Sequence, residues 1–376
     1  MKIRYFDNAA TTDIKEKVLR EMFPYLANLY GNASSMYSIG RQSKRAIEEA
    51  RGKVASIINA NPKEIYFTSC GSESDNAVIK GFAYANESKG KHIITSKIEH
   101  HAILESCETL EKQGFKVTYL NVDKDGIVDL QELINAITPE TILISIMFAN
   151  NEVGTIQPIE EIAQIAKSHD IAFHTDAVQA VGNVPIDVKK MGIDMLSMSA
   201  HKIHGPKGVG ALYVRNGIEI EKYINGGHQE RNKRAGTENI AGIVGIGEAC
   251  NIAEKTLEYH IQYLTKLRNY YTKKIMQHIP DAKINGSMEK RLPGNMNISF
   301  KNTDAQELLF KLDEVGICAS SGSACNTGTQ EPSHVLTAMR LTPDEAKGAL
   351  RTTFGDDNTF EDVDFLVECL KNFIKF

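Results

Sequence analysis

The sequence has few cysteines and no long apolar run. Six cysteines without regular spacing among 376 residues do not make a disulfide framework, and they favour reduced thiols, as in the cytosol. Apolar runs such as residues 141–149 are far too short to cross a bilayer, and the first residues lack the apolar centre of a signal peptide. We therefore expect a cytoplasmic protein with no membrane partner.

Positive charge is not in excess either. The 43 Lys and Arg residues are outnumbered by 48 Asp and Glu residues, which gives a formal net charge of -5. This balance provides no bulk electrostatic attraction for nucleic acid, so we expect no nucleic-acid partner. A hydrophobic share of 42% and a charged share of 24% are typical of a soluble globular protein. At roughly 150 residues per domain, the length favours about two domains.

Short apolar, β-branched runs alternate with amphipathic stretches from about residue 64 onward. Such runs, separated by helices, predict strands that are buried on both faces of a mostly parallel α/β sheet. The predicted strands are residues 64–69, 91–96, 116–122, 141–149, 171–176 and 194–199, with 208–215 closing the sheet. The predicted helices between them include residues 76–87, 102–113 and 159–168.

The last third of the chain predicts a smaller α+β domain. It begins with one long helix, residues 238–279, which would bridge two domains. Strands at 295–300 and 317–319, helices at 305–315 and 360–376, and a loop of small polar residues at about 320–334 follow. We divide the chain into a large domain, residues 13–256, and a small domain, residues 1–12 and 257–376.

Polar residues that follow the predicted strands are the candidate site residues, because ligands bind beyond the carboxyl ends of such strands. Gly71 and Ser72 open a helix whose free N–H groups suit a phosphate, although a plain helix cap is the more common role. His100 alone is more often structural than catalytic. Asp176, with Gln179 close behind, needs a cation such as a protonated ring nitrogen, unless it only caps the next segment.

Lys202 lies between a buried run and a Gly-Pro turn. Partial enclosure would lower the pKa of its amine and suit it to Schiff-base chemistry, whereas most lysines are solvated surface charges. The spacing of His201 and His204 also permits a metal site, which we rank low because no carboxylate stands at ligand spacing beside them. A phosphate cradle, a strand-end Asp and a strand-end Lys together favour a pyridoxal phosphate site.

The chain resembles the pyridoxal-phosphate-dependent cysteine desulfurases of the NifS/IscS type, which have the class V aminotransferase fold, a fold-type I architecture. The matching stretches span nearly the whole chain. The most specific are the segment around Lys202, residues 197–215, and the loop that contains Cys325, residues 320–336. They are YFDNAATT (5–12), YGNASS (30–35), FTSCGSESDNAVIKG (67–81), TSKIEHHAIL (95–104), NNEVGTIQP (150–158), HTDAVQAVG (174–182), SMSAHKIHGPKGVGALYVR (197–215), AGTEN (235–239) and SSGSACNTGTQEPSHVL (320–336).

The resemblance implies a role for each matching residue around pyridoxal phosphate in the large domain. Lys202 would bind the cofactor covalently and move the substrate Cα proton, Asp176 would pair with the pyridine nitrogen, and His100 would stack over the ring and assist proton transfer. Asn151 and Gln179 would contact the side of the ring. The phosphate would be held by Gly71, Ser72, Ser199 and His201, with Thr237 reaching in from a second subunit of a homodimer.

The resemblance also implies the substrate, L-cysteine, and the fate of its sulfur. Arg351, with Asn32 nearby, would clamp the substrate carboxylate, although an exposed arginine in a late strand is the alternative. Cys325 would take the sulfur as a persulfide, leaving alanine, and pass it to an acceptor such as an iron-sulfur scaffold or a thiolation enzyme. One alternative is selenocysteine lyase or a different class V enzyme. The other is a sulfur-relay subunit that acts mainly by binding a partner.

Overall fold

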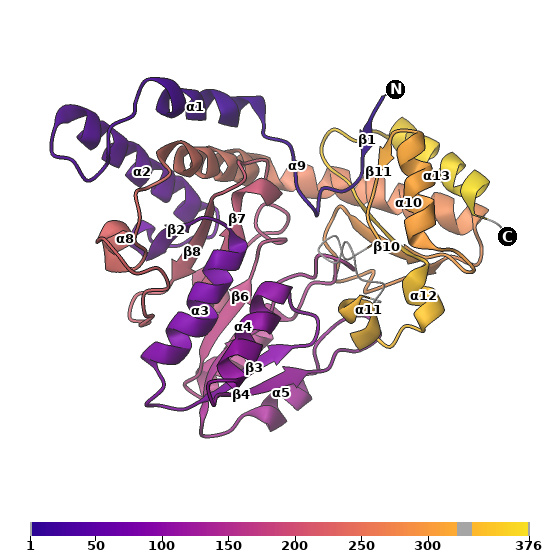
Figure 1. Ribbon diagram of the computed structural model, residues 1–376. Helices are drawn as coiled ribbons and strands as arrows, with labels where there is room; N and C mark the ends of the chain where they lie inside the picture. The colour runs from indigo at the N-terminus through magenta and orange to yellow at the C-terminus, as the bar shows by residue number, and fades with distance from the viewer. Residues whose placement is uncertain (1, 322–332, 375–376) are drawn as a thin grey trace.

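A seven-stranded sheet is the centre of the computed structural model, which describes residues 2–321 and 333–374 (Figure 1). Its strand order is β2-β8-β7-β6-β5-β3-β4, and only β8 runs antiparallel to its neighbours. The strands are β2 (Ile65–Thr68), β3 (His92–Ser96), β4 (Lys116–Leu120), β5 (Thr141–Ser145), β6 (Ala172–Asp176), β7 (Met195–Ser199) and β8 (Gly210–Val214). The predicted mostly parallel α/β sheet is confirmed.

Helices cover the sheet because its central strands are buried along their whole length and need apolar cover on both faces. Between the strands lie η1 (Pro62–Glu64), α3 (Gly71–Ala85), α4 (His101–Glu111), α5 (Leu130–Ala136), α6 (Ile159–Ser168), α7 (Val188–Met191) and η2 (Ala200–Lys202). The bounds of α6 are those predicted. Helix α3 begins five residues before its predicted start, because Gly71 and the small polar residues after it already form the first turn.

A 39-residue helix, α9 (Ile240–His278), connects two hydrophobic cores. Its first part packs against α1 (Glu16–Ala27) and α2 (Ser38–Ser56), and contributes to the core of the large sheet. Its second part contributes Leu267 and Tyr271 to a separate core. At 1.5 Å per residue the helix is about 58 Å long. A short helix with three left-handed residues, α8 (Gln229–Asn232), precedes it.

The second core lies between small sheets and the C-terminal helices (Figure 1). One sheet has the order β12-β10-β9, and β1 pairs with β11 in parallel. The elements are β1 (Arg4–Tyr5), β9 (Lys283–Ile284), β10 (Asn295–Ser299), α10 (Ala305–Glu314), β11 (Ile317–Cys318), α11 (His334–Ala338), α12 (Pro343–Lys347), β12 (Ala349–Thr353) and α13 (Phe360–Phe373). The residue bounds of the two domains stay a prediction. None of the described helices is long and apolar enough to span a membrane.

Candidate functional site

A pocket of about 340 Å³ lies where the parallel strands of the large sheet end. This is the edge at which open α/β sheets bind ligands. Most of the predicted site residues line it: Gly71, Ser72, His100, Asn151, Asp176, Gln179, Ser199, His201, Lys202 and Arg351. They come from segments up to 280 residues apart, between Gly71 and Arg351. The strand ends therefore meet around one cavity, as parallel pairing requires.

The N-terminus of α3 forms one wall of the pocket and suits an anion. Cys70 at the N-cap makes no side-chain hydrogen bond to the helix, so the first N–H groups stay available. A Cβ atom on Gly71 would lie 2.7 Å from Cγ2 of Val178, so only glycine fits here without displacing that side chain. The hydroxyl of Ser199 is buried without a hydrogen-bond partner in the described part of the chain. A phosphate would satisfy both groups.

Asp176 ends β6 and is 8% exposed. Its carboxylate accepts the N–H of Val178 at 2.9 Å. Burial raises its pKa, while the nearby His100 and Lys202 act to lower it. A carboxylate held in this way gains a partner when a protonated ring nitrogen binds beside it. The capping contact and the cation-binding role are therefore compatible.

Lys202 ends the 3-10 turn η2, directly after β7, and is half-buried. Its amine donates hydrogen bonds to the carbonyl oxygens of Ala9 and Ala10, at 2.5 and 2.8 Å. The N-terminal segment thus crosses the site and orients the amine. The sequence had no local signal for this contact, because the two segments are about 190 residues apart.

His100 is the N-cap residue of α4, and its Nδ1 accepts the N–H of Ala102 at 3.1 Å. Burial lowers the pKa of His100, which favours the neutral ring. Because Nδ1 is used as an acceptor, the proton of the neutral ring lies on Nε2. Nε2 of His100 is therefore a hydrogen-bond donor, and Nδ1 is not available to accept a proton while it holds the N–H of Ala102.

His201 and His204 do not converge. Nδ1 of His201 lies 3.1 Å from the hydroxyl of Thr11, and His201 lines the pocket described above. Nδ1 of His204 lies 2.9 Å from Asp13, and His204 lines a different cavity. Burial lowers the pKa of His201 to about 4, so its ring is neutral at physiological pH. Among the described residues, no three His, Cys, Asp or Glu side chains cluster as metal ligands would.

Arg351 is buried in β12, with an exposed fraction of 1%. The alternative of an exposed surface arginine is wrong. Nη2 lies 2.7 Å from Oδ1 of Asp7, and Nη1 donates to the carbonyl oxygen of Asn151 at 3.1 Å. The guanidinium thus reaches the pocket with its charge balanced by Asp7, a partner that the sequence did not reveal.

Two predicted residues lie away from the pocket, and one lies outside the described residues. Asn32 is exposed between α1 and α2, where its side chain accepts the N–H of Ser34 at 2.9 Å. Thr237 is exposed beside a small cavity that Ser69 and Arg234 also line. Cys325 falls within residues 322–332, outside the part of the chain that the structure describes.

Several pocket residues lie in stretches that carry the resemblance but were not predicted as site residues. His101 and His334 line the pocket with their ring centroids 4.8 Å apart. Glu152 accepts a hydrogen bond of 2.5 Å from Ser333, the N-cap residue of α11. Asp75, in the second turn of α3, is fully buried against the pocket.

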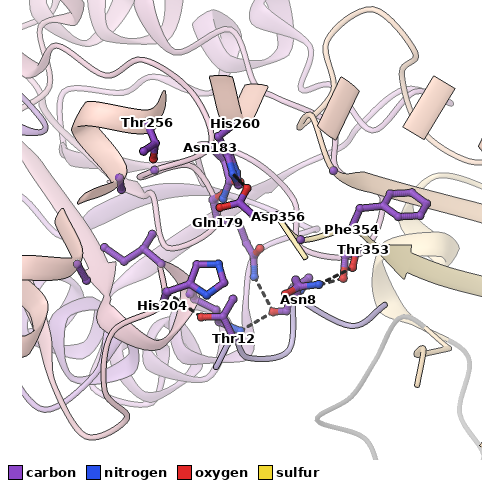
Figure 2. A pocket seen from close by; sticks show the side chains of 18 of the residues that line it. Asn8, Thr12, Gln179, Asn183, His204, Thr256, His260, Thr353, Phe354 and Asp356 are labelled. Carbon is purple, nitrogen blue, oxygen red and sulfur yellow. Dashed lines mark hydrogen bonds and ion pairs between the residues drawn. The ribbon is translucent and has the colours of Figure 1, made fainter. Parts of the chain in front are cut away.

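A second cavity, of about 60 Å³, has polar lining residues that include Asn183, His260 and Asp356 (Figure 2). Lys202 and Gln179 line both cavities. Its polar side chains already pair with one another: His260 contacts Asp356 at 2.5 Å and Asn183 at 3.0 Å. Because these groups are satisfied, the cavity offers a ligand few free contacts.

The chain is similar to known proteins over nearly its whole length. The aminotransferase class-V family model matches residues 4–366. The cysteine desulfurase IscS of Clostridium botulinum (strain Hall) is 53% identical, over 99% of this chain and 94% of that protein. Among solved structures, a NifS-like protein has a TM-score of 0.93 and 40% identity, covering 99% of both chains. The structure of SspA in complex with cysteine has a TM-score of 0.84 and 39% identity, covering 93% of this chain and 98% of that one.

Proposed function

Since the chain belongs to the aminotransferase class-V family, we propose that it is a cysteine desulfurase that uses pyridoxal phosphate. It converts L-cysteine to L-alanine and keeps the sulfur as a persulfide on Cys325. The observation that carries the proposal is the single pocket in which an anion-binding helix end, Asp176, Lys202 and Arg351 meet. A relative at 53% identity named cysteine desulfurase supports the reaction, and the cysteine complex of SspA supports the substrate.

The residues present fit pyridoxal phosphate. The phosphate would lie at the N-terminus of α3, held by Gly71 and Ser72, and would satisfy the unpartnered hydroxyl of Ser199. His201 lies at the same wall as a neutral donor, and Asp176 would hold the ring nitrogen protonated. When bound, the cofactor supplies an electron sink that makes the Cα–H and Cβ–S bonds of an amino acid breakable. Asn151 and Gln179 would fix the ring from the side.

Proton transfer would involve Lys202 and His100. The Lys202 amine binds the cofactor and moves the proton at the substrate Cα, and the carbonyl oxygens of Ala9 and Ala10 set its resting position. His100 has its proton on Nε2, because Nδ1 accepts the N–H of Ala102. The neutral ring therefore offers a hydrogen bond from Nε2 and has no free lone pair with which to accept a proton. The proton acceptor for the Cys325 thiol is then the substrate amine rather than the resting His100.

Arg351 would bind the substrate carboxylate. A buried guanidinium has donors in a planar fork that matches a carboxylate. Asp7 balances its charge when no substrate is bound. The substrate carboxylate would share the guanidinium of Arg351 with Asp7.

The sulfur step is balanced without an external oxidant. An S–S bond forms between Cys325 Sγ and the substrate sulfur while the Cβ–S bond breaks, and the carbon fragment gains a proton and leaves as alanine. The thiolate is the nucleophile in such a step. Two of the buried thiols are poor candidates, because burial raises the pKa of Cys107 and of Cys250 to about 12.

The protein would act as a homodimer in the cytoplasm. Thr237 and Asn32 are exposed and do not line the pocket of their own chain. Residues beside Asn32 form an exposed apolar surface, with Tyr30 81% and Met36 87% exposed. We propose that a second copy covers this surface and that Thr237 serves the phosphate site of the neighbouring subunit. A sulfur-acceptor protein would then take the persulfide sulfur from Cys325.

Borohydride reduction followed by peptide mapping tests the proposal. We expect a pyridoxyl group on Lys202 and, with L-cysteine, one alanine released per persulfide formed on Cys325. Cys325→Ser should lose the persulfide, whereas the matched control Cys70→Ser should keep it. A pyridoxyl group on another lysine, or unchanged sulfide release by Cys325→Ser under a thiol reductant, would contradict the proposal.

A further inference from the structure

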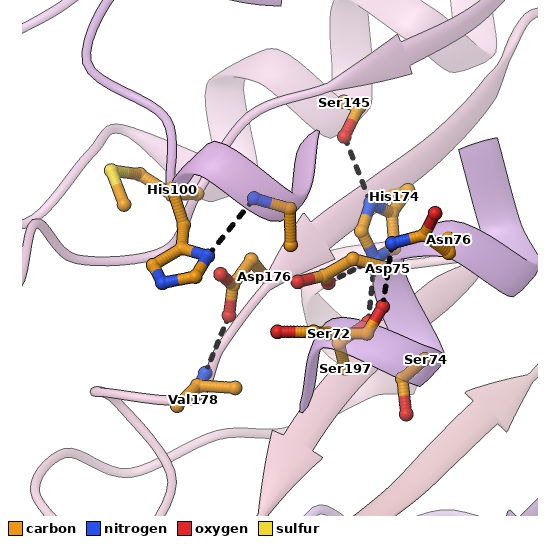
Figure 3. A network of polar contacts seen from close by, with 12 residues as sticks. Ser72, Ser74, Asp75, Asn76, His100, Ser145, His174, Asp176, Val178 and Ser197 are labelled. Carbon is orange, nitrogen blue, oxygen red and sulfur yellow. Dashed lines mark hydrogen bonds and ion pairs between the residues drawn. The ribbon is translucent and has the colours of Figure 1, made fainter. Parts of the chain in front are cut away.

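Asp75 is a buried acid of the pocket to which the proposed reaction gives no role. Its side chain is 0% exposed and lines the pocket together with Asp176 (Figure 3). Neither of its oxygens has a hydrogen-bond partner of good geometry among the residues that the structure describes, and Ser197 is the neighbouring hydroxyl that acts on its pKa as a hydrogen-bond donor would. Buried polar groups in native proteins nearly always have a partner. An unsatisfied carboxyl group at a pocket wall therefore points to something that binds in the pocket.

A chain of polar side chains from three adjacent strands ends at Asp75 (Figure 3). His174 lies 2.9 Å from the hydroxyl of Ser145 through Nδ1, and 3.0 Å from the hydroxyl of Ser197 through Nε2. Its Nε2 is also 3.9 Å from Oδ1 of Asp75. Burial lowers the pKa of His174 to about 3, so the ring is neutral and forms no ion pair with Asp75.

One tautomer of His174 gives every donor in this chain an acceptor. With the proton on Nε2, Ser145 donates to Nδ1 and His174 donates to Ser197. The hydroxyl hydrogen of Ser197 is then free to point toward Asp75. The opposite tautomer would use Ser197 as the donor to His174 and leave Asp75 without any donor. The chain thus favours an arrangement in which Ser197 holds one oxygen of Asp75.

The charged neighbours of Asp75 disfavour its ionised form. Burial raises the pKa of Asp75 well above its usual range, and Asp176, Glu99 and Cys70 act in the same direction, while a hydrogen bond from Ser197 acts to lower it. Lys202 and His100 act to lower the pKa of Asp176, which favours the ionised form of that residue. Two ionised carboxylates beside one protonated ring nitrogen would leave a buried negative charge without a partner, which is costly.

We propose that Asp75 is a positioning residue that stays protonated beside Asp176, so that Asp176 alone carries the charge that faces the cofactor ring nitrogen. Ser197 holds one oxygen of the acid, and the O–H group on the other oxygen points into the pocket. The inference rests on the proposed function, because it assumes pyridoxal phosphate as the ligand.

Cofactor affinity as a function of pH tests this inference. We would titrate the apo-protein with pyridoxal phosphate from pH 6 to 9.5 and follow binding by absorbance, for the wild type, Asp75→Asn, Asp75→Ala and the exposed control Asp281→Asn. At pH 7, Asp75→Asn should keep the wild-type Kd within about threefold, because an amide is neutral and has the shape of the acid. Asp75→Ala should weaken binding about tenfold, since Ser197 loses its acceptor. Above pH 8 the wild type should lose more affinity than Asp75→Asn.

Ser197→Ala provides a second measurement if Asp75→Asn does not fold. Removing a donor that stabilises the ionised form of Asp75 should move the alkaline loss of affinity to higher pH. The inference is overturned if Asp75→Asn weakens binding tenfold or more at pH 7, if its pH profile equals that of the wild type, or if Ser197→Ala causes no shift or a downward one. A wild-type protein that binds no pyridoxal phosphate would instead refute the proposed function.

Discussion

Replacing Arg351 and Asp7, singly and together, separates substrate binding from structural charge balance. Nη2 of Arg351 is 2.7 Å from Asp7, and the side chains of the two residues are 2% and 15% exposed. Arg351→Gln removes the positive partner of a largely buried carboxylate, which costs about 3–5 kcal/mol of unfolding free energy. The double variant Asp7→Asn/Arg351→Gln leaves no charge unbalanced, so we expect it to recover most of that loss.

Both variants should lose the carboxylate clamp to the same extent. A hydrogen bond to a charged group contributes about 1.5–3 kcal/mol. At 1.36 kcal/mol per factor of ten, this corresponds to a fall in kcat/KM for L-cysteine of about 10- to 150-fold. Stability and catalysis are therefore expected to respond differently to the second substitution.

Urea unfolding and alanine release measure the two effects. The exposed Arg340 provides a matched control, because Arg340→Gln removes the same charge outside the pocket and should change neither quantity. A double variant with kcat/KM within threefold of the wild type would refute the clamp. A double variant no more stable than Arg351→Gln would refute the charge balance with Asp7.

Three further outcomes follow from the described contacts. Glu230→Ala should destabilise the protein by about 3–5 kcal/mol in urea unfolding, because Glu230 accepts two hydrogen bonds from the buried Arg51, at 2.7 and 2.8 Å; a loss below 1 kcal/mol would contradict this. Burial raises the pKa of Glu99 to about 8, so the folded state holds a proton there that the unfolded state releases above its lower pKa. Stability should therefore fall by about 1 kcal/mol per pH unit from pH 5 to 8, and the slope should flatten in Glu99→Gln; parallel curves for the two proteins would count against it. Gly71→Ala should weaken pyridoxal phosphate binding about tenfold, because the new Cβ would lie 2.7 Å from Val178 and overpacking costs about 1–3 kcal/mol. An unchanged Kd in an absorbance titration would contradict this, since it would mean that the Val178 side chain moves aside at no cost.

The sequence predicted the large sheet well because its strands are buried on both faces. Such strands appear as short continuous apolar runs, and each of the seven predicted runs contains one strand. The long helix was also predicted, within two residues of α9 at each end. Its role in joining two cores needed the structure, since the apolar positions of one helix do not show which core each faces.

The sequence placed in the pocket the residues that follow strands, but it did not reveal two of the acids around them. Asp176 and Lys202 directly follow or end apolar runs, so strand topology brings them together. Asp75 lies inside a helix, and Asp7 precedes the first predicted strand of the large sheet by more than 50 residues. Their contacts depend on how distant segments pack, which local patterns do not encode.

Strand β1 gives the protein a particular order of maturation. Arg4 pairs with Ile317 in β11, across 313 residues of chain. The same N-terminal segment continues to Ala9 and Ala10, whose carbonyl oxygens hold the amine of Lys202. The pairing of β1 with β11 can therefore form only after a ribosome has synthesised nearly the entire polypeptide. A deletion that removed Ala9 and Ala10 would take both carbonyl acceptors from a lysine almost 200 positions away.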